Sequence, residues 1–321
     1  MKIERVVLIG GSGFVGSALA NRLSEVAVTV LVPTRHASRA NHLLPLPTVD
    51  TIEADVHDPA TLERLVTGAD AVVNLVGILH SRSGSPFGPD FKHAHVELPR
   101  KIVAACRAGG VPRLLHISAL GASPDGPSEY LRSKAAGEAE IRAAGDSPAW
   151  TILRPSVMFG RDDHFLNLFA HLAHTFPVLP LARPTARFQP VYVEDVVGVM
   201  RRCLCDPTTA GQTFELAGPK VYTLREIVEY VSELAGAPRP ILPLPQGLAM
   251  LQAGFMELMP SPIMTRDNLR SMQVDNVVSG EPLPFGLEAT PLESVAPVYI
   301  GERSFRARYF PLRTSSRRHI R

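Results

Sequence analysis

The chain has few cysteines, few lysines and little net charge for its 321 residues. Its three cysteines, Cys106, Cys203 and Cys205, form no Cys-x-x-Cys motif, so neither a disulfide framework nor a cysteine-based metal site is expected. The formal net charge is +2, which gives no strong overall field for nucleic acid. We therefore expect a protein of a reducing compartment that has no nucleic-acid partner.

Long apolar runs are also scarce. The sequence starts Met1-Lys-Ile-Glu4, and the apolar run that follows is short and ends in glycines, which predicts no signal peptide. The uncharged stretch 240–256 is interrupted by prolines and a glycine, which argues against a membrane-spanning helix. With 45% hydrophobic and 20% charged residues, the composition is that of a globular protein of one or two domains in the cytoplasm.

Strand and helix patterns alternate through the first half of the chain. Short apolar runs typical of buried strands occupy residues 5–9, 28–32, 51–54, 71–75, 114–118 and 150–153. Their alternation with helical segments predicts an α/β fold, a doubly wound parallel sheet of the Rossmann type. We expect a nucleotide-binding domain over residues 1–155 and a smaller substrate lobe over 156–300. Residues 188–205 should return to the Rossmann sheet, and 301–321 should form a flexible basic tail.

A glycine-rich turn joins the first strand to the first helix. The residues Gly10-Gly-Ser-Gly13-Phe-Val-Gly16 directly follow the apolar run 5–9 and open a segment with helical apolar spacing. Glycine permits the tight turn, and backbone N–H groups at the positive end of the helix bind a pyrophosphate. The turn predicts a dinucleotide site with contacts at Gly10, Ser12, Gly13, Phe14, Val15 and Gly16.

The end of the second strand indicates which dinucleotide is bound. It reads Val32-Pro-Thr-Arg35 and has no acidic residue. NAD sites usually place Asp or Glu there to bind the ribose 2′-hydroxyl, whereas a guanidinium suits a 2′-phosphate. We therefore predict NADP(H) rather than NAD(H). Asp55, after the third strand, is a candidate to bind the adenine amino group, with a simple helix cap as the alternative.

Tyr130 and Lys134 are four residues apart near the start of a helix predicted over 128–144, so they share a face. The chain has five lysines, and about 0.1 Tyr-x-x-x-Lys matches are expected by chance. A phenol titrates near pH 10, and a nearby ammonium favours the phenolate. Tyr130 is thus a candidate to exchange a proton with a carbonyl oxygen, and Ser118 to hold that oxygen. The alternative is a chance pair on a surface helix.

Together these motifs resemble those of the extended and atypical short-chain dehydrogenase/reductases. The segments Asn74-Leu-Val-Gly77 and Leu153-Arg-Pro-Ser-Val157 add to the resemblance, which covers residues 3–235. It implies a catalytic set of Ser118, Tyr130 and Lys134. It further implies cofactor contacts at Arg35 for the 2′-phosphate, Asp55 and Val56 for adenine, Val76 and Gly77 along the channel, Tyr130 and Lys134 near the nicotinamide ribose, and Pro155, Ser156 and Val157 for the carboxamide.

Four further segments resemble one atypical branch, which contains the nucleotide-binding accessory subunit of respiratory complex I, its bacterial relatives and a protein associated with ubiquinone synthesis. They are residues 118–122, 134–138, 188–196 and 266–269. The branch implies contact with a respiratory complex or with the inner membrane face, and some members hold NADPH without turnover. His95 stands where the wider family has an asparagine that supports a proton relay, so that support is missing here.

Two weaker patterns leave alternatives open. His171 and His174 share a helical face, but no third ligand is evident, and we predict no metal site. The large apolar residues Leu248, Leu251, Phe255 and Leu258 fall at helical spacing. Core packing is the favoured interpretation, and an apolar lid or membrane-contact face is the alternative.

The sequence as a whole predicts an NADP(H)-dependent oxidoreductase that acts on a small apolar carbonyl or quinone-type compound. Two other classes fit parts of the pattern. One is a non-catalytic structural or assembly protein that NADPH stabilises. The other is a sugar-nucleotide epimerase or dehydratase, which would need a polar substrate wall, and residues 238–264 supply few polar groups. The oligomeric state is left open.

Overall fold

The strands of the first half are almost continuously apolar because both faces of their sheet are covered. In the computed structural model, which describes residues 2–257, 259, 262 and 264–301, seven parallel strands form one sheet in the order β11-β6-β5-β4-β1-β2-β3. They are β1 Arg5–Ile9, β2 Thr29–Thr34, β3 Val49–Glu53, β4 Ala71–Asn74, β5 Arg113–Ile117, β6 Ala149–Pro155 and β11 Gln212–Leu216. The predicted doubly wound α/β fold is confirmed.

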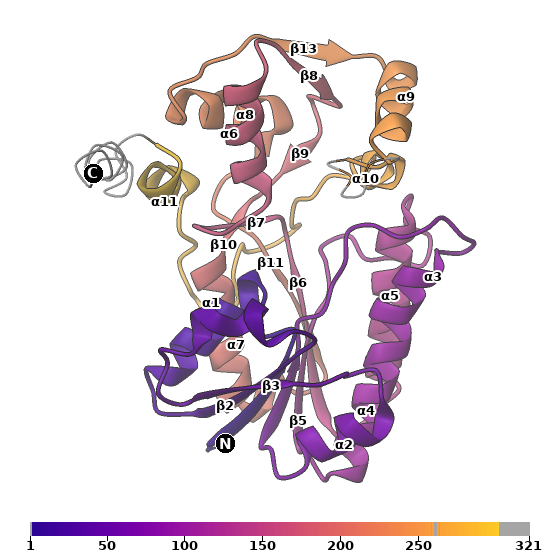
Figure 1. Cartoon of the computed structure of the whole chain (residues 1–321), viewed down its shortest axis with the longest axis vertical. Helices are drawn as coiled ribbons and strands as arrows, with labels where there is room; N and C mark the ends of the chain where they lie inside the picture. Colours follow the sequence, from indigo (N-terminus) through magenta and orange to yellow (C-terminus); the bar gives the residue numbers. More distant parts are fainter. Residues whose placement is uncertain (1, 258, 260–261, 263, 302–321) are drawn as a thin grey trace, which may run out of the picture.

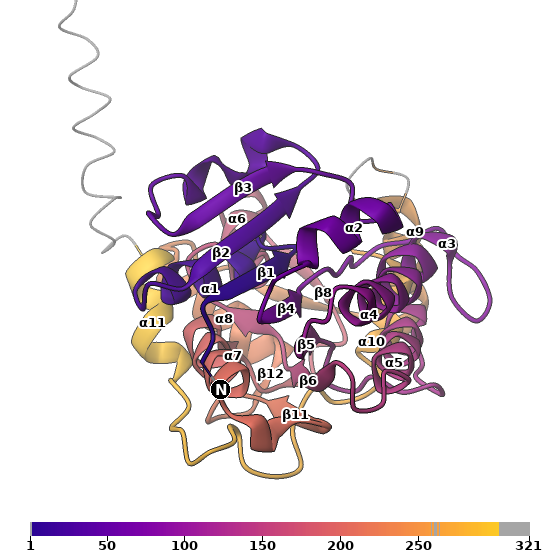
Figure 2. The ribbon, with the colours of Figure 1, turned by 90° about the horizontal axis from the view of Figure 1, so that it is seen from below.

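Helices cover the two faces of this sheet (Figure 2). One face packs against α1 Phe14–Ser24 and α7 Val193–Cys205, and the other against α2 Pro59–Val66, α4 Leu98–Ala108 and α5 Glu129–Arg142. The strand order reverses between β1 and β4, and ligands bind at the carboxyl ends of strands at such a reversal. Both the glycine turn and the residues that follow β4 lie there.

The helical segment between β4 and β5 is not one continuous α-helix. A short helix, α3 Pro89–Phe91, leads into a π-helical turn, η2 Lys92–Glu97, before α4 begins. Pro99 has no N–H to donate to the carbonyl of His95, four residues earlier, so the regular ladder cannot close there. Helix α5 also passes so closely that a Cβ at Gly137 would overlap the same carbonyl oxygen. The π turn therefore brings His95 against the helix that carries Tyr130.

The second half of the chain forms a smaller lobe above the carboxyl ends of the strands (Figure 1). Three two-stranded sheets lie outside the main sheet, pairing β7 Met158–Phe159 with β10 Val191–Tyr192, β9 Arg187–Phe188 with β12 Tyr222–Thr223, and β8 Leu179–Ala182 with β13 Ile241–Leu244. The lobe's helices are α6 Phe165–Thr175, α8 Leu224–Leu234, α9 Gln246–Met256, α10 Arg266–Ser271 and α11 Leu292–Tyr299. Two short 3₁₀ helices lie beside the main sheet, η1 Ala37–Leu43 between β2 and β3, and η3 Pro207–Thr209 between α7 and β11. Of the segment 188–205 that was expected to return to the main sheet, residues 193–205 pack against it as helix α7, whereas β9 and β10 lie in the small sheets outside it. The strand that joins the edge of the main sheet is β11.

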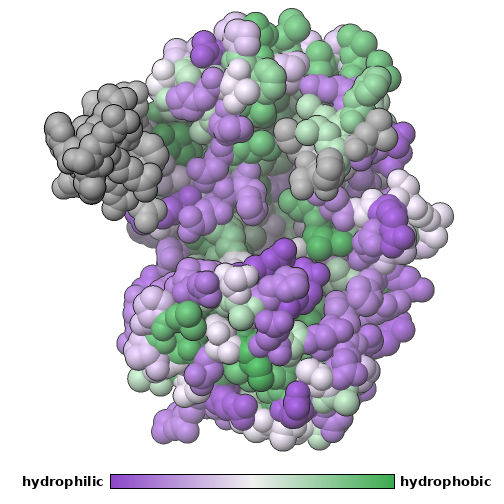
Figure 3. All heavy atoms as spheres, in the orientation of Figure 1, coloured by the Kyte–Doolittle hydropathy of each residue, from purple (hydrophilic) through white to green (hydrophobic). Residues whose placement is uncertain are grey.

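The core-packing interpretation of the apolar pattern in 248–258 is wrong. Leu248, Leu251 and Phe255 are 56%, 60% and 66% exposed, and Leu258 lies outside the described residues. Helix α9 instead buries its small residues, Ala249 and Ala253, against the lobe. Figure 3 shows hydrophobic residues gathered over the upper part of the molecule, where α9 and β13 lie.

Two sequence predictions concern membranes and the end of the chain. Within the part of the chain that the structure describes, no helix combines the length and apolarity needed to cross a bilayer. The predicted flexible basic tail, 301–321, lies outside the described residues from position 302 onward.

Candidate active site

The glycine turn has the backbone geometry of an anion cradle. Gly10 has a φ of +85°, and a Cβ there would lie 3.1 Å from the backbone N of Val76, so β1 and the residues after β4 approach closely. A Cβ at Gly16 would lie 2.5 Å from the Cα of Gly11, which only glycine avoids. Gly13 caps α1 without a side-chain hydrogen bond, so the first N–H groups of the helix remain available to a phosphate.

An exposed arginine, Arg35, lies at the carboxyl end of β2, next to β3. Arg35 directly follows β2, is exposed, and forms no ion pair or hydrogen bond within the described residues. An Asp55 carboxylate oxygen accepts a hydrogen bond from the His57 backbone N–H at 2.9 Å, which fixes the turn after β3. Burial lowers the pKa of His57, and so does the charge of His93, whose ring stacks on it. The charge of Asp55 raises this pKa, whereas the charges of Lys101 and Arg35 lower it. These groups therefore lie close to one another beside the ends of β2 and β3.

Gly77, in the segment after β4, lies close to Lys134 on helix α5. Asn74, the last residue of β4, accepts a hydrogen bond from Val76 N–H at 3.2 Å, and its amide nitrogen lies 3.0 Å from His116 Nδ1. A Cβ at Gly77 would lie 3.9 Å from Lys134 Nζ. The segment predicted to line the cofactor channel thus faces the buried ammonium of the Tyr-x-x-x-Lys pair.

The pKa of Tyr130 is raised, not lowered as its spacing from Lys134 had predicted. Lys134 Nζ donates to the carbonyl of Ile117 at 2.8 Å, and burial lowers the pKa of Lys134 to about 8 although Glu138 opposes this. Burial raises the pKa of Tyr130 to about 12, and no described residue hydrogen-bonds to its hydroxyl. Tyr130 is therefore a neutral phenol at neutral pH in this structure, rather than a phenolate favoured by the ammonium.

Ser118 lies beneath α5. Its Oγ is fully buried and makes no hydrogen bond within the described residues, and the same holds for Nε2 of His116, two residues earlier on the same strand face. Burial alone would raise the pKa of the Glu138 carboxyl, but Arg154 and Arg142 outweigh it and hold that pKa below its usual value.

His95 takes a fixed place behind Tyr130. Its Nε2 accepts a hydrogen bond from the backbone N–H of Ile78 at 3.0 Å, so Nδ1 carries the proton and faces Ser133 Oγ at 2.8 Å. Ser133 in turn donates to the backbone carbonyl of Tyr130 at 2.7 Å. Burial lowers the pKa of His95 well below its ordinary value, which agrees with a neutral ring. Both ring nitrogens are engaged, so His95 supports the loop after Gly77 and does not relay protons.

Asn276 and Asp267 contact segments of the candidate site and were not predicted as site residues from the sequence. The Asn276 side-chain oxygen accepts hydrogen bonds from Ser156 Oγ at 2.6 Å and Val157 N–H at 3.0 Å, which holds the segment predicted to meet the carboxamide. Asp267 accepts from two N–H groups at the start of α5. The resemblance of 266–269 was a signal for Asp267, but no local pattern links either residue to the site.

Comparison with known proteins identifies the family. The model of the NAD dependent epimerase/dehydratase family matches residues 6–217, which include the glycine turn, Tyr130, Lys134 and β11. The chain belongs to this family. It is an NAD(P)-binding family of extended short-chain dehydrogenase/reductases, as the motifs predicted.

Relatives within the epimerase/dehydratase family differ in their named roles. The chain is 33% identical over 297 residues to NADH dehydrogenase [ubiquinone] 1 alpha subcomplex subunit 9, mitochondrial, of Mus musculus, covering 89% of this chain and 77% of that protein. It is 29% identical to the ceramide reductase of Caulobacter vibrioides, covering 78% and 76%. The UDP-glucose 4-epimerase of Thermus thermophilus, solved in complex with NAD, shares the fold with a TM-score of 0.61 at 21% identity, covering 84% and 99%.

The described part of this epimerase/dehydratase chain offers no cluster of three or more His, Cys, Asp or Glu residues suited to a metal ion. His171 and His174, the one pair that the sequence suggested, are both exposed on α6.

Proposed function

We propose that the protein is an NADP(H)-dependent reductase of an apolar carbonyl or quinone-type compound. The observation that carries this proposal is the approach of Gly77 to Lys134 Nζ, because it joins the nucleotide crevice to the helix with the reactive side chains. The glycine cradle, the uncapped start of α1 and the unpaired Arg35 fit a dinucleotide with a 2′-phosphate.

Each side chain then has a role in the proposal. A bound NADPH supplies the hydride. Lys134 would bind the nicotinamide ribose, and the phenol of Tyr130 would give its proton to the substrate oxygen. Because burial raises the pKa of Tyr130 to about 12, its phenol is protonated at neutral pH and able to act as the proton donor. Ser118 remains the candidate to hold the substrate oxygen, and residues 155–157 to meet the carboxamide.

The apolar substrate class is supported by the lobe. Helix α9 and strand β13 expose Leu242, Leu248, Leu251 and Phe255, and residues 240–256 carry no charge (Figure 3). Such a surface suits an apolar substrate or the edge of a membrane that contains it. The Caulobacter relative is named a ceramide reductase, and the mitochondrial relatives are named as subunits of NADH dehydrogenase, which supports a peripheral membrane or respiratory-complex location.

The substrate proposal is tested by NADPH oxidation with a panel of long-chain ketones and short-chain quinones presented in detergent micelles. We expect oxidation with at least one apolar compound and none with UDP-glucose. Thermal stabilisation by NADPH without oxidation of it by any compound would contradict the reductase proposal. Stabilisation by UDP-glucose would favour a sugar-nucleotide enzyme instead.

A non-catalytic role is the second candidate, and one observation favours it. Lys134 donates to the Ile117 carbonyl, and no described residue bonds to the Tyr130 hydroxyl, so the pair is not assembled as an acid–base unit in this structure. In that case NADPH would stabilise the fold for an assembly partner. The NADPH oxidation assay separates the two candidates.

The cofactor preference is tested by replacing Arg35 with alanine. We expect NADPH binding to weaken about tenfold or more, because a charge-assisted hydrogen bond to the phosphate is lost, while NADH binding stays the same. Titration calorimetry with each nucleotide measures both affinities. Arg64→Ala, which removes an exposed arginine of α2, is the matched control. Equal weakening of NADPH and NADH would remove the assignment of Arg35 to the 2′-phosphate.

A further inference from the structure

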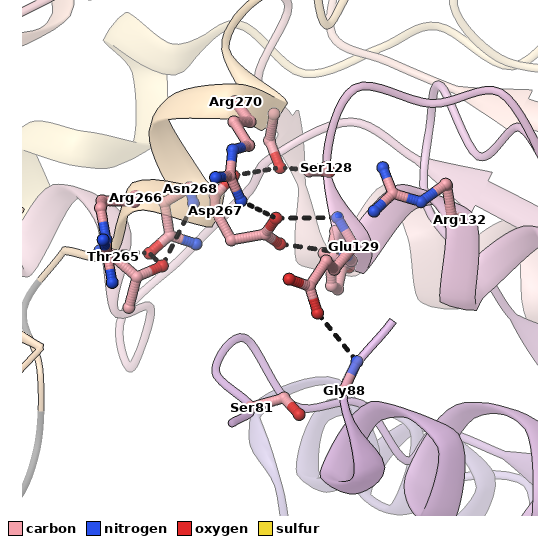
Figure 4. Close-up of polar contacts among 12 residues, drawn as sticks. Ser81, Gly88, Ser128, Glu129, Arg132, Thr265, Arg266, Asp267, Asn268 and Arg270 are labelled. Carbon is pink, nitrogen blue, oxygen red and sulfur yellow. Dashed lines mark hydrogen bonds and ion pairs between the residues drawn. The ribbon is translucent and has the colours of Figure 1, made fainter. Parts of the chain in front are cut away.

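The first turn of α5, which carries Tyr130, is capped from the other lobe. The backbone N–H groups of Glu129 and Tyr130 donate to the two carboxylate oxygens of Asp267, at 2.7 and 3.0 Å (Figure 4). The next N–H, of Leu131, donates to Ser128 Oγ at 3.1 Å. The first donors of a helix have no partner within it, so these contacts satisfy the groups that would otherwise be orphaned.

Asp267 itself is held firmly in the lobe. Its side chain is 14% exposed, and it lies in α10, whose start is closed by a capping box between Thr265 and Asn268. Ser271, at the end of the same helix, donates to Ser128 Oγ at 2.8 Å, so α10 contacts the start of α5 at a second point. A carboxylate at the positive end of a helix is also electrostatically favourable.

The same turn of α5 also fixes the loop that follows β4. The Glu129 carboxylate accepts hydrogen bonds from the N–H groups of Gly84 at 3.1 Å and Gly88 at 2.8 Å. Arg132 donates to the carbonyl of Pro86 at 2.8 Å. A displacement of the first turn would therefore move the loop beside the site as well as Tyr130.

Lys134, one turn later, is anchored independently. Its ammonium bonds to Ile117, and Glu138, a further turn on, pairs with Arg154 through two hydrogen bonds of 2.7 Å. Loss of the Asp267 cap should therefore loosen the helix as far as Tyr130 and leave Lys134 in place. The position of Tyr130 therefore depends on the cap from Asp267, whereas that of Lys134 depends on its own contact with Ile117.

The geometry points to Asp267 as a positioning residue for Tyr130, which acts across the interface between the lobes from 137 positions away in the sequence. It binds the backbone N–H of Tyr130 itself and so sets where the phenol stands relative to the crevice. The kinetic consequence rests on the proposed reductase function, whereas the structural consequence does not.

Hydrogen–deuterium exchange of the full chain tests the structural part. We expect Asp267→Ala to accelerate exchange at residues 129–131 by roughly fivefold to tenfold, the effect of losing a helix cap, with α4 unchanged. Asp267→Asn, which keeps one acceptor oxygen, should give a smaller acceleration and guards against a variant that fails to fold. Asp275→Ala is the matched control, because Asp275 is a 51% exposed carboxylate in the same lobe, 3.4 Å from Arg187. Unchanged exchange at 129–131 in Asp267→Ala would overturn the proposal.

Steady-state kinetics test the positioning role once an active substrate is found. We expect kcat to fall about tenfold or more in Asp267→Ala, with NADPH affinity within about twofold of wild type and partial recovery in Asp267→Asn. Faster exchange with an unchanged kcat would mean that Asp267 stabilises the helix without positioning Tyr130, and would overturn the role. If Tyr130→Phe retains full turnover, the reductase proposal fails, but the exchange result still decides whether Asp267 caps α5.

Discussion

Replacing Tyr130 with phenylalanine is expected to lower kcat for NADPH oxidation by about 10²- to 10⁴-fold, which is the usual contribution of a general acid. NADPH affinity should not change, because the ring remains in place. The centroid of the Tyr130 ring lies 5.7 Å from that of His95 and 6.0 Å from that of Phe91, and phenylalanine keeps both contacts. Only the oxygen that donates the proton is removed.

The measurement is initial-rate kinetics combined with NADPH titration of each variant. Tyr230→Phe serves as the control, since Tyr230 is a partly buried tyrosine of α8 outside the site and the substitution removes the same atom. Full turnover in Tyr130→Phe would exclude Tyr130 as the proton donor. A loss of NADPH affinity in that variant would show that the hydroxyl serves binding instead.

Replacing Glu138 with alanine is expected to reduce the free energy of unfolding by about 3 kcal/mol, at the lower end for breaking a buried ion pair. The Glu138 side chain is completely buried and bonds to Arg154 and Arg142, which would lose their shared partner. The side chains of Arg154 and Arg142 are 23% and 41% exposed, so water relieves part of the loss. Urea denaturation at pH 7 measures the effect.

A matched control lies two residues away on α5. Glu140 also pairs with an arginine, Arg100 at 2.6 Å, but on the surface, and Glu140→Ala should cost less than about 1 kcal/mol. The pKa of Glu138 is lower in the folded state than in the unfolded chain, so its contribution is complete above about pH 5, and it is lost as the pH falls from there through the folded value. The difference between wild type and Glu138→Ala should therefore shrink on acidification. Equal costs for the two variants at pH 7 would contradict the importance of the buried pair.

The features that were predictable from the sequence are those that depend on residues close together along the chain. Three features depend on neighbours within a few residues: the glycine turn, the position of Arg35 directly after β2, and the spacing of Tyr130 and Lys134 on α5. Parallel pairing of the strands followed from their continuous apolar character. The family itself was evident because several such local motifs occur together.

The features that escaped prediction depend on contacts between distant segments. Nothing near Asp267 or Asn276 in the sequence indicates that they bind α5 and residues 156–157. The π turn around His95 arises from Pro99 together with the close passage of Gly137, and neither alone ends a helix. On α9 the periodic leucines suggested a core, but burial was decided by the alanines between them, which fit closely against the lobe. The charge state of Tyr130 likewise depends on its burial in the folded chain, which raises the pKa of its phenol.

The position of β11 has a consequence for dissecting the protein. This strand, from residues 212–216, covers the outer side of β6, and Arg113 on β5 uses its buried guanidinium to hold the backbone of Cys203 and the hydroxyl of Thr209. A fragment truncated at residue 155 would leave β6 as an open edge that invites pairing with other copies, and would remove two of the acceptors of the buried Arg113 guanidinium, which would keep only those at Ala149 and Thr151. The nucleotide-binding half is therefore not a separable module, and a shortened version intended for expression has to retain the chain through residue 216.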